Sequence, residues 1–190
     1  SNVHNTQTRT HNTMVSKQLH IIMPVKDSIE MAEKAILAIV NSGHSVCIYD
    51  DNSTIENANR LDQIAQQHHI ELIHISTLTD HPSPNYRLVL QHAQKRALLN
   101  QQHLVIVESD VMVKKDTLSL LAQQAQAGVG MVAAVTTNEE GIFNFPYHYL
   151  LKMRYRKLAK ETISTNKRFS FCCTLLTHEF LQKADFELLD

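Results

Sequence analysis

The chain has 190 residues, 43% of them hydrophobic, which supports one compact domain with a substantial core. Its formal net charge is −1, with acidic and basic residues intermixed, so the sequence offers no electrostatic footprint for nucleic acid. No apolar run approaches the roughly 18 residues that cross a bilayer, and the three cysteines match neither a zinc site nor a disulfide scaffold. We therefore expect a soluble, cytoplasmic protein without a nucleic-acid partner.

The start of the chain differs in composition from the rest. Residues 1–17 are rich in Thr, Asn, His and Gln and have no hydrophobic period. We interpret them as a disordered tail or as a remnant of expression. A single domain over 18–190 is predicted to follow.

The first predicted elements have the order strand, helix, strand, helix. A short apolar run at 19–25 predicts a buried strand, and apolar residues at helical spacing over 29–40 predict a helix after it. Residues 45–50 predict the second strand. Ser53 and Glu56, three positions apart, predict a capping box that opens the second helix.

The same alternation continues along most of the chain, and residues 138–168 interrupt it by mixing aromatic with basic residues. Strands that alternate with helices predict an α/β fold, with a mostly parallel central sheet and helices on both faces. The remaining predicted elements are a strand at 70–76, a helix around 90–97, a strand at 103–109, a helix after Asp116, and strands at 130–136 and 169–177.

Carboxylates follow two of the predicted strands. Asp50 and Asp51 end the second strand, and Glu108 and Asp110 end the fourth. In an open α/β sheet, ligands bind beyond the carboxyl ends of the strands, so both groups are expected on one edge. A hard divalent cation is held by one or two carboxylates together with phosphate oxygens and water. For either group alone, the simpler alternative is a turn former or helix cap.

Three segments carry a resemblance to a known family: "HIIMPVKDS", "VCIYDDNST" and "HLVIVESDVMV", in this order with helices between them. Over residues 19–136 the chain resembles the nucleotide-sugar-binding half of a family-two glycosyltransferase, with the Rossmann-like GT-A fold. The resemblance implies a hexosyltransferase-type enzyme that moves a sugar from a nucleoside-diphosphate donor, such as a UDP-sugar, to an acceptor hydroxyl. It also implies Mg²⁺ or Mn²⁺ as cofactor and inversion at the sugar carbon.

The resemblance assigns roles to residues of the first half of the chain. Pro24 and Val25 would line the base pocket, and Asp51 would accept a hydrogen bond from the nucleobase, whereas Asp50 would orient the turn. Asp27 and Ser53 belong to the same expected nucleotide-binding set.

Further positions are assigned in the second half. Asp110 would take the last position of a DXD-like motif and coordinate the metal, with Glu108 in the first position. Glutamate there departs from the family pattern, so its longer side chain is expected to reach the ribose, a water or the metal. Arg87 matches a position where some relatives place an arginine near the nucleotide; a solvated helix residue is the alternative.

The resemblance assigns fewer residues to the acceptor side of the reaction than to the donor side. The family's catalytic base follows a segment like "FELLD" at 186–190, where this chain ends, so the catalytic residue is unknown and the domain is expected to be truncated there. The resemblance implies a glycan, lipid-linked or protein acceptor. The basic run at 152–168 fits either a solvated helix face or a surface for a diphosphate, a lipid phosphate or a membrane, which leaves peripheral membrane contact open.

Three other functions remain open from the sequence. A nucleotidyltransferase normally has a glycine-rich loop after the first strand, and "PVKDSIE" has no glycine. A receiver-like phosphoacceptor signalling domain also combines an acidic pair with a later aspartate, but its pair usually follows the first strand. A nucleotide-sugar-binding module without catalysis is the third alternative.

Overall fold

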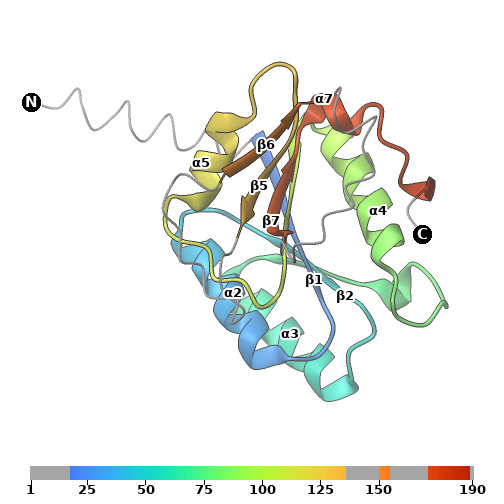
Figure 1. Cartoon of the computed structure of the whole chain (residues 1–190). Helices are drawn as coiled ribbons and strands as arrows, with labels where there is room; N and C mark the ends of the chain where they lie inside the picture. The colour runs from blue at the N-terminus through green and yellow to red at the C-terminus, as the bar shows by residue number, and fades with distance from the viewer. Residues whose placement is uncertain (1–17, 136–149, 155–170, 189–190) are drawn as a thin grey trace, which may run out of the picture.

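The computed structural model describes residues 18–135, 150–154 and 171–188 (Figure 1). Each predicted strand is present, with ends that differ from the prediction by at most two residues. The strands are β1 (Leu19–Val25), β2 (Cys47–Asp50), β3 (Glu71–His74), β4 (His103–Val107), β5 (Val129–Val135), β6 (Leu150–Arg154) and β7 (Phe171–Leu176). The helices are α2 (Ile29–Asn41), α3 (Ile55–His68), η1 (Ile75–Thr77), α4 (Tyr86–Leu99), α5 (Thr117–Gln124), α7 (His178–Leu181) and η3 (Phe186–Leu188).

The described strands form one seven-stranded sheet in the order β3-β2-β1-β4-β7-β5-β6. The first four strands of this order are mutually parallel. β7 lies between β4 and β5 and is antiparallel to both. β6 pairs antiparallel with β5. The predicted α/β architecture is thus confirmed, and its parallel half is the half that carries the predicted ligand-binding edge.

One strand was absent from the sequence-based prediction. β6 lies where only an interruption of the alternation was expected, and its residues Lys152 and Arg154 were counted with a basic helix. That expectation is wrong for residues 152–154. β6 is the last strand of the sheet order, and charged residues are common at sheet edges, where they discourage further pairing. Its pairing with β5, rather than its own apolar pattern, makes it a strand.

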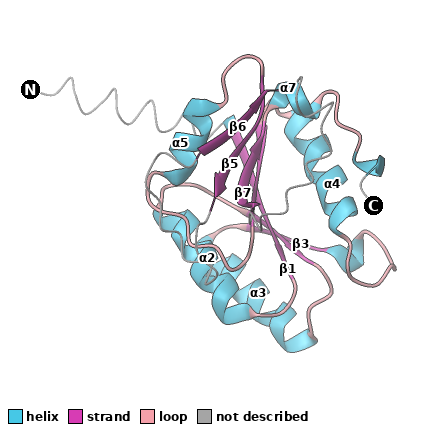
Figure 2. Ribbon diagram, in the orientation of Figure 1, coloured by secondary structure: helices cyan, strands magenta, loops and turns pink. Residues whose placement is uncertain are grey.

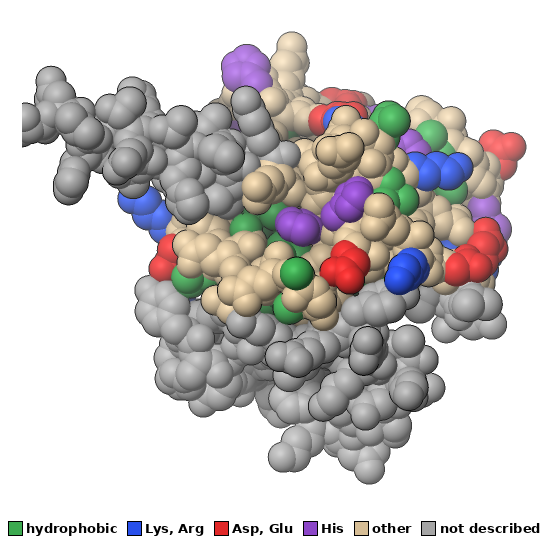
Figure 3. Space-filling view, turned by 90° about the horizontal axis from the view of Figure 1, so that it is seen from above, with side chains coloured by type: hydrophobic (Ala, Val, Ile, Leu, Met, Phe, Trp, Pro, Cys, Tyr) green, Lys and Arg blue, Asp and Glu red, His purple; other side chains and the backbone are tan. Residues whose placement is uncertain are grey.

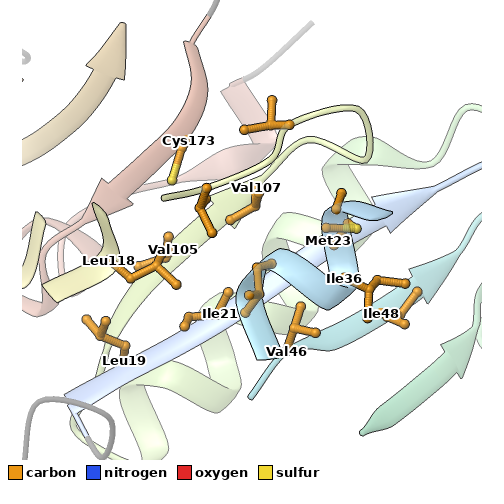
Figure 4. Packing of buried hydrophobic residues seen from close by; sticks show 14 of the residues in the cluster. Leu19, Ile21, Met23, Ile36, Val46, Ile48, Val105, Val107, Leu118 and Cys173 are labelled. Carbon is orange, nitrogen blue, oxygen red and sulfur yellow. The ribbon is translucent and has the colours of Figure 1, made fainter. Parts of the chain in front are cut away.

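Helices cover both faces of the sheet (Figure 2). Because side chains of a strand alternate between faces, Ile21 and Met23 of β1 belong to one buried cluster and Ile22 to another. The first cluster contains apolar residues of α2, α3 and α5, and the second contains those of α4 and α7. Figure 4 shows part of the first cluster, with Leu19, Ile21, Met23, Ile36, Val46, Ile48, Val105, Val107, Leu118 and Cys173 labelled.

Charge is dispersed over the face that Figure 3 shows, which is the face seen from above in Figure 1. Acidic, basic and histidine side chains of the described residues lie among other side chains rather than in one patch of a single sign. This distribution agrees with the net charge of −1. Among the described helices, none is both long and apolar enough to cross a membrane.

Candidate nucleotide-sugar site

The carboxyl ends of β1 to β4 form a single edge, which we call the rim. Val25 pairs with Asp50, and Asp50 pairs with His74, so three strands end level with one another. β4 lies on the other side of β1, with Ile22 opposite Ile106. Parallel neighbours are about 4.8 Å apart, so the carboxylates after β2 and β4 are separated by the width of one intervening strand. The structure therefore places both acidic groups on the same edge, as expected.

Asp50 is buried at the rim, with 3% of its surface exposed. One carboxylate oxygen, Oδ1, accepts a hydrogen bond from the backbone N–H of Ser53 at 3.1 Å. The other, Oδ2, lies 2.7 Å from Nδ1 of His74. Asp50 therefore shapes the turn after β2, which is the role that the sequence predicts for it.

Asp51 binds the loop that precedes α4. Its Oδ2 accepts hydrogen bonds from the backbone N–H of Asn85 at 2.8 Å and from the Ser83 hydroxyl at 3.0 Å, and its Oδ1 accepts one from Nδ2 of Asn85 at 2.9 Å. Nδ2 of Asn52 donates a fourth, longer bond to Oδ1 at 3.4 Å, so the described side chains fill the roughly four acceptor positions of this carboxylate. Ser83 and Asn85 were not found from the sequence, where the only signal was that Asn85 precedes a helix.

The loops after β1 and β2 are joined by reciprocal hydrogen bonds. The backbone N–H of Asp27 donates to the Ser53 hydroxyl at 2.9 Å, and Oδ1 of Asp27 accepts from the backbone N–H of Thr54 and from Nδ2 of Asn57, both at 2.9 Å. The donors from Asn57 and Thr54 lower the pKa of Asp27. Asp27 and Ser53, both expected at the nucleotide site, thus brace the rim.

The predicted capping box at Ser53 is wrong by one residue. Thr54 is the N-cap of α3, and its hydroxyl accepts from the backbone N–H of Asn57 at 3.4 Å. The Ser53 hydroxyl is instead used by Asp27. A contact between two loops has therefore taken the side chain that local sequence spacing assigned to the helix end.

Three rim residues have left-handed backbone conformations without being glycine. Asp27, Ser28 and Asn52 have φ angles of 53°, 50° and 59°. Such conformations are uncommon for residues with a side chain and cost on the order of 1 kcal/mol or more each. The hydrogen bonds between the two loops offset this cost, so the rim loops are shaped by the tertiary structure.

Glu108 and Asp110 are exposed at the end of β4. Among the described residues, no hydrogen-bond or ion-pair partner binds either carboxylate. Burial, followed by the charge of Asp110, raises the pKa of Glu108. Tyr86, the first residue of α4, lies near this pair, since burial and then the charge of Glu108 raise its pKa. Neighbouring carboxylates without a described cationic partner are the type of side chain that can contribute ligands to a divalent cation.

A metal fits this pair only together with its ligand. The described residues contain no group of three or more His, Cys, Asp or Glu side chains that could hold a metal ion. Mg²⁺ is usually bound through one or two carboxylates plus substrate phosphates and water. Glu108 and Asp110 meet that requirement because both carboxylates are exposed and available.

Other predicted residues contribute less directly to the rim. The side chain of Val25 is buried in the core, and its carbonyl accepts a hydrogen bond from the backbone N–H of Asp51 at 2.8 Å, so it supports the rim from beneath. Pro24 is partly exposed in the same strand. Arg87 is half exposed on α4, and its ion-pair partner is Glu187 at 4.0 Å. The side chain of Arg87 therefore extends toward the C-terminal segment that contains Glu187.

Several large hydrophobic side chains are exposed in the segments that follow the parallel strands. Among the described large hydrophobic residues, most of the exposed ones follow the carboxyl end of a parallel strand, including Tyr86, which is 51% exposed. Apolar contact area with a few placed polar groups is typical of ligand sites. The others in this position are Met31, Ile55, Leu78 and Met112.

Several predicted features lie outside the described residues. They are the tail at 1–17, most of the basic run at 152–168, and Asp190 at the end of the "FELLD" segment. The expectations about disorder, membrane contact and the missing catalytic base remain predictions.

Comparisons with known proteins identify the family. The model described as glycosyl transferase family 2 matches residues 20–184. Similar solved structures include residues 1–349 of TarS from S. aureus (18% identity, TM-score 0.42, covering 60% of this chain and 34% of that one). Another is glucosyl-3-phosphoglycerate synthase from Mycobacterium tuberculosis in complex with phosphoglyceric acid (13% identity, TM-score 0.45, covering 64% and 46%). The chain thus covers less than half of these proteins. No curated protein sequence matches it.

Proposed function

Because the chain belongs to glycosyl transferase family 2, we propose that it transfers a sugar from a nucleoside-diphosphate donor to an acceptor hydroxyl, and that the donor binds along the rim. The observation that carries this proposal is the placement of Glu108 and Asp110, two carboxylates without a partner in the described part of the chain, on the same edge as the braced loops of Asp27 and Asp51. A UDP-sugar is the expected donor.

The diphosphate is proposed to lie over Glu108 and Asp110 with Mg²⁺ or Mn²⁺. The bound cation would neutralise the negative charge that develops on the leaving diphosphate. Asp110 is the proposed metal ligand, and Glu108 either shares the metal or binds the ribose or a water. The raised pKa of Glu108 supports this arrangement, because a cation would relieve its repulsion by Asp110.

The nucleobase is proposed to lie near Asp51, between the loops after β1 and β2. The imide N–H of a uracil or thymine would replace the exposed 3.4 Å bond from Asn52 on Oδ1 of Asp51. Asp27 and Ser53 hold these loops together, which reduces the entropy lost when a ligand binds. Pro24, Val25 and Arg87 complete the proposed nucleotide-binding set, and Arg87 would leave its 4.0 Å ion pair with Glu187 to reach the nucleotide.

The acceptor side of the reaction is proposed in outline only. An inverting transfer needs a base that takes the proton of the acceptor hydroxyl. We assign that role to no described residue. The acceptor is a glycan, a lipid-linked molecule or a protein, with residues 152–168 as the proposed contact for an anionic lipid surface.

Calorimetry with UDP and Mn²⁺ tests the proposed site. We expect Mn²⁺-dependent binding of UDP to the wild-type chain and a loss of at least tenfold in affinity for Asp110→Asn, equivalent to about 1.4 kcal/mol. Asp80→Asn is the matched control, since Asp80 is exposed and has no described hydrogen bond or ion pair. Equal UDP affinity in wild type and Asp110→Asn, with both proteins folded, would contradict the assignment.

A further inference from the structure

His74, the last residue of β3, bridges two carboxylates. Its Nδ1 is 2.7 Å from Oδ2 of Asp50, and its Nε2 is 2.8 Å from Oδ1 of Asp62 on α3. The two partners differ in environment, since 4% of the Asp50 side chain and 58% of the Asp62 side chain are exposed. The imidazole therefore connects a buried carboxylate at the rim to a carboxylate in solvent.

The chemistry of this bridge requires a doubly protonated ring. An ionised carboxylate only accepts hydrogen bonds, so both ring nitrogens of His74 must donate, and only the imidazolium has two N–H groups. Burial lowers the pKa of His74, but the hydrogen bonds to Asp62 and Asp50 outweigh it, and the pKa lies above the ordinary value of 6.5. A neutral ring would keep one of the two bonds.

The bridge extends into the proposed nucleotide site. Asp50, held by His74 through one oxygen, accepts the Ser53 N–H with the other, and the Ser53 hydroxyl accepts the N–H of Asp27. Asp51 follows Asp50 directly in the chain. The position of the loop at 51–54 therefore depends on a buried carboxylate whose only described cationic partner is His74.

The groups that face His74 come from three elements. β2 contributes Asp50 and α3 contributes Asp62, and both favour the charged ring. From η1, the Thr77 hydroxyl donates to the backbone carbonyl of His74 at 2.6 Å and carries no charge. Among the described residues, no other charged side chain has a resolved electrostatic effect on the ring.

We propose that His74 is a positioning residue of the nucleotide site, and that its imidazolium, bridging Asp62 and Asp50, holds the loop at 51–54 in the conformation that binds the donor nucleotide. This inference rests on the proposed function. It makes nucleotide affinity greatest when the ring carries both protons and weaker after one is lost. No proton is transferred to the substrate in this role.

The first test measures Mn²⁺-dependent UDP affinity against pH across the titration range of His74. Loss of one charge-assisted hydrogen bond behind the loop is expected to weaken wild-type affinity about tenfold as pH rises. His74→Gln is expected to bind at the weak level with a flat profile. His68→Gln, which changes a histidine without a described side-chain hydrogen bond, is expected to keep the wild-type profile.

A second variant distinguishes positioning from a merely structural role. Asp62→Asn removes one of the two carboxylates that favour the imidazolium, without touching Asp50 or the loop. The variant is expected to keep wild-type affinity at low pH and to lose it at a lower pH than wild type. Because Asp62 is exposed, this variant is expected to fold even if His74→Gln does not. An unshifted profile in Asp62→Asn would overturn the proposal.

A measurement without nucleotide separates this proposal from the proposed function. Amide exchange of Ser53, corrected for the intrinsic pH dependence of exchange, should lose protection as His74 deprotonates, which NMR follows on the ring itself. Amide protection of Ser53 that stays constant while His74 loses its proton would overturn the positioning role. If protection follows the titration while UDP fails to bind at every pH, the proposed function falls and the control of the loop by His74 stands.

Discussion

At the scale of single residues, the rim is built from polar side chains that bind one another. Asp51 is bound by Asn85, and Asp27 by Thr54 and Asn57, so each carboxylate is oriented before a ligand arrives. Hydrogen bonds to charged groups contribute about 1.5–3 kcal/mol each. Orientation of this kind lowers the cost of binding, because fewer side chains must be ordered when the ligand arrives.

Asn85→Ala tests this arrangement at Asp51. The substitution removes the Nδ2 donor but keeps the backbone N–H donor, and Asn85 is buried with 7% exposed. We expect the free energy of unfolding to fall by about 2 kcal/mol and UDP affinity to fall with it. Urea unfolding measures the first quantity and calorimetry the second.

Asn100→Ala is the matched control, because Asn100 lies at the opposite end of the same helix and is exposed. A loss of stability in Asn100→Ala equal to that in Asn85→Ala would mean that the effect comes from helix termini in general. It would then say nothing about the rim.

At the scale of elements, α4 connects the rim to the C-terminal segment at 181–188. Its first residue, Tyr86, lies by Glu108, and five residues further along, Gln91 donates to Glu187 at 2.7 Å. Gln94 donates to the backbone carbonyls of both Leu181 and Ala184, at 2.9 and 2.8 Å. Phe186 is buried against the same helix cluster, so the segment runs along α4 toward the rim.

Gln94→Leu should release this segment from α4. The substitution keeps the apolar bulk of the side chain but leaves two carbonyls without their donor, at a cost of about 1–3 kcal/mol. We expect faster amide exchange and faster proteolysis within 182–188, with exchange in β1 and β2 changed less. Gln66→Leu, at an exposed position of α3, is the control. Unchanged exchange in the segment would show that apolar contacts alone hold it.

At the scale of the whole molecule, the family assignment and the sheet topology agree. The strand order and the helices on both faces are those of the GT-A glycosyltransferase fold that the resemblance implied, and the family model covers residues 20–184. The nucleotidyltransferase and phosphoacceptor alternatives are set aside on this finding. Membership of glycosyl transferase family 2 is shown, and sugar transfer, its donor, its metal and its acceptor are proposals.

The pH dependence of stability is a property of the whole fold, and His20 and His74 act on it with opposite signs. His20 is buried, its Nε2 has no hydrogen-bond partner among the described residues, and burial followed by the charge of Arg96 lowers its pKa from 6.5 to about 4. The folded state therefore resists its protonation, so stability falls as pH drops from 6.5 toward about 4. For His74, with a raised pKa, the contribution is full below 6.5 and is lost as pH rises through the folded pKa.

His20→Leu is expected to reduce the loss of folding stability that occurs as pH falls below 6.5. The substitution removes both the buried titratable group and its nitrogen that lacks a described partner. A pKa shift of this size lowers the free energy of unfolding by up to about 3 kcal/mol at acidic pH. The free energy of unfolding in urea, measured at several pH values, should be less dependent on pH on the acid side than in wild type. If the free energy of unfolding decreased at acidic pH as much in His20→Leu as in wild type, other groups would control acid unfolding.

Much of the fold follows from local patterns. The apolar runs of β1 and β4 and the helical spacing of α2 are properties of short segments, which is why their positions were predictable. The placement of Asp50, Asp51, Glu108 and Asp110 at strand ends is also local, and parallel strands necessarily bring those ends to one edge. The family resemblance and the location of the candidate site therefore came from the sequence alone.

The tertiary structure decided which side chain binds which. Ser53 binds Asp27 rather than capping α3, Asp51 binds Asn85, and His74 joins Asp50 to Asp62. The strand β6 and the insertion of β7 between β4 and β5 were likewise settled by pairing with distant strands. These features depend on residues far apart in the chain, and hydrogen bonds over such separations form only once the core has fixed the distance between their elements.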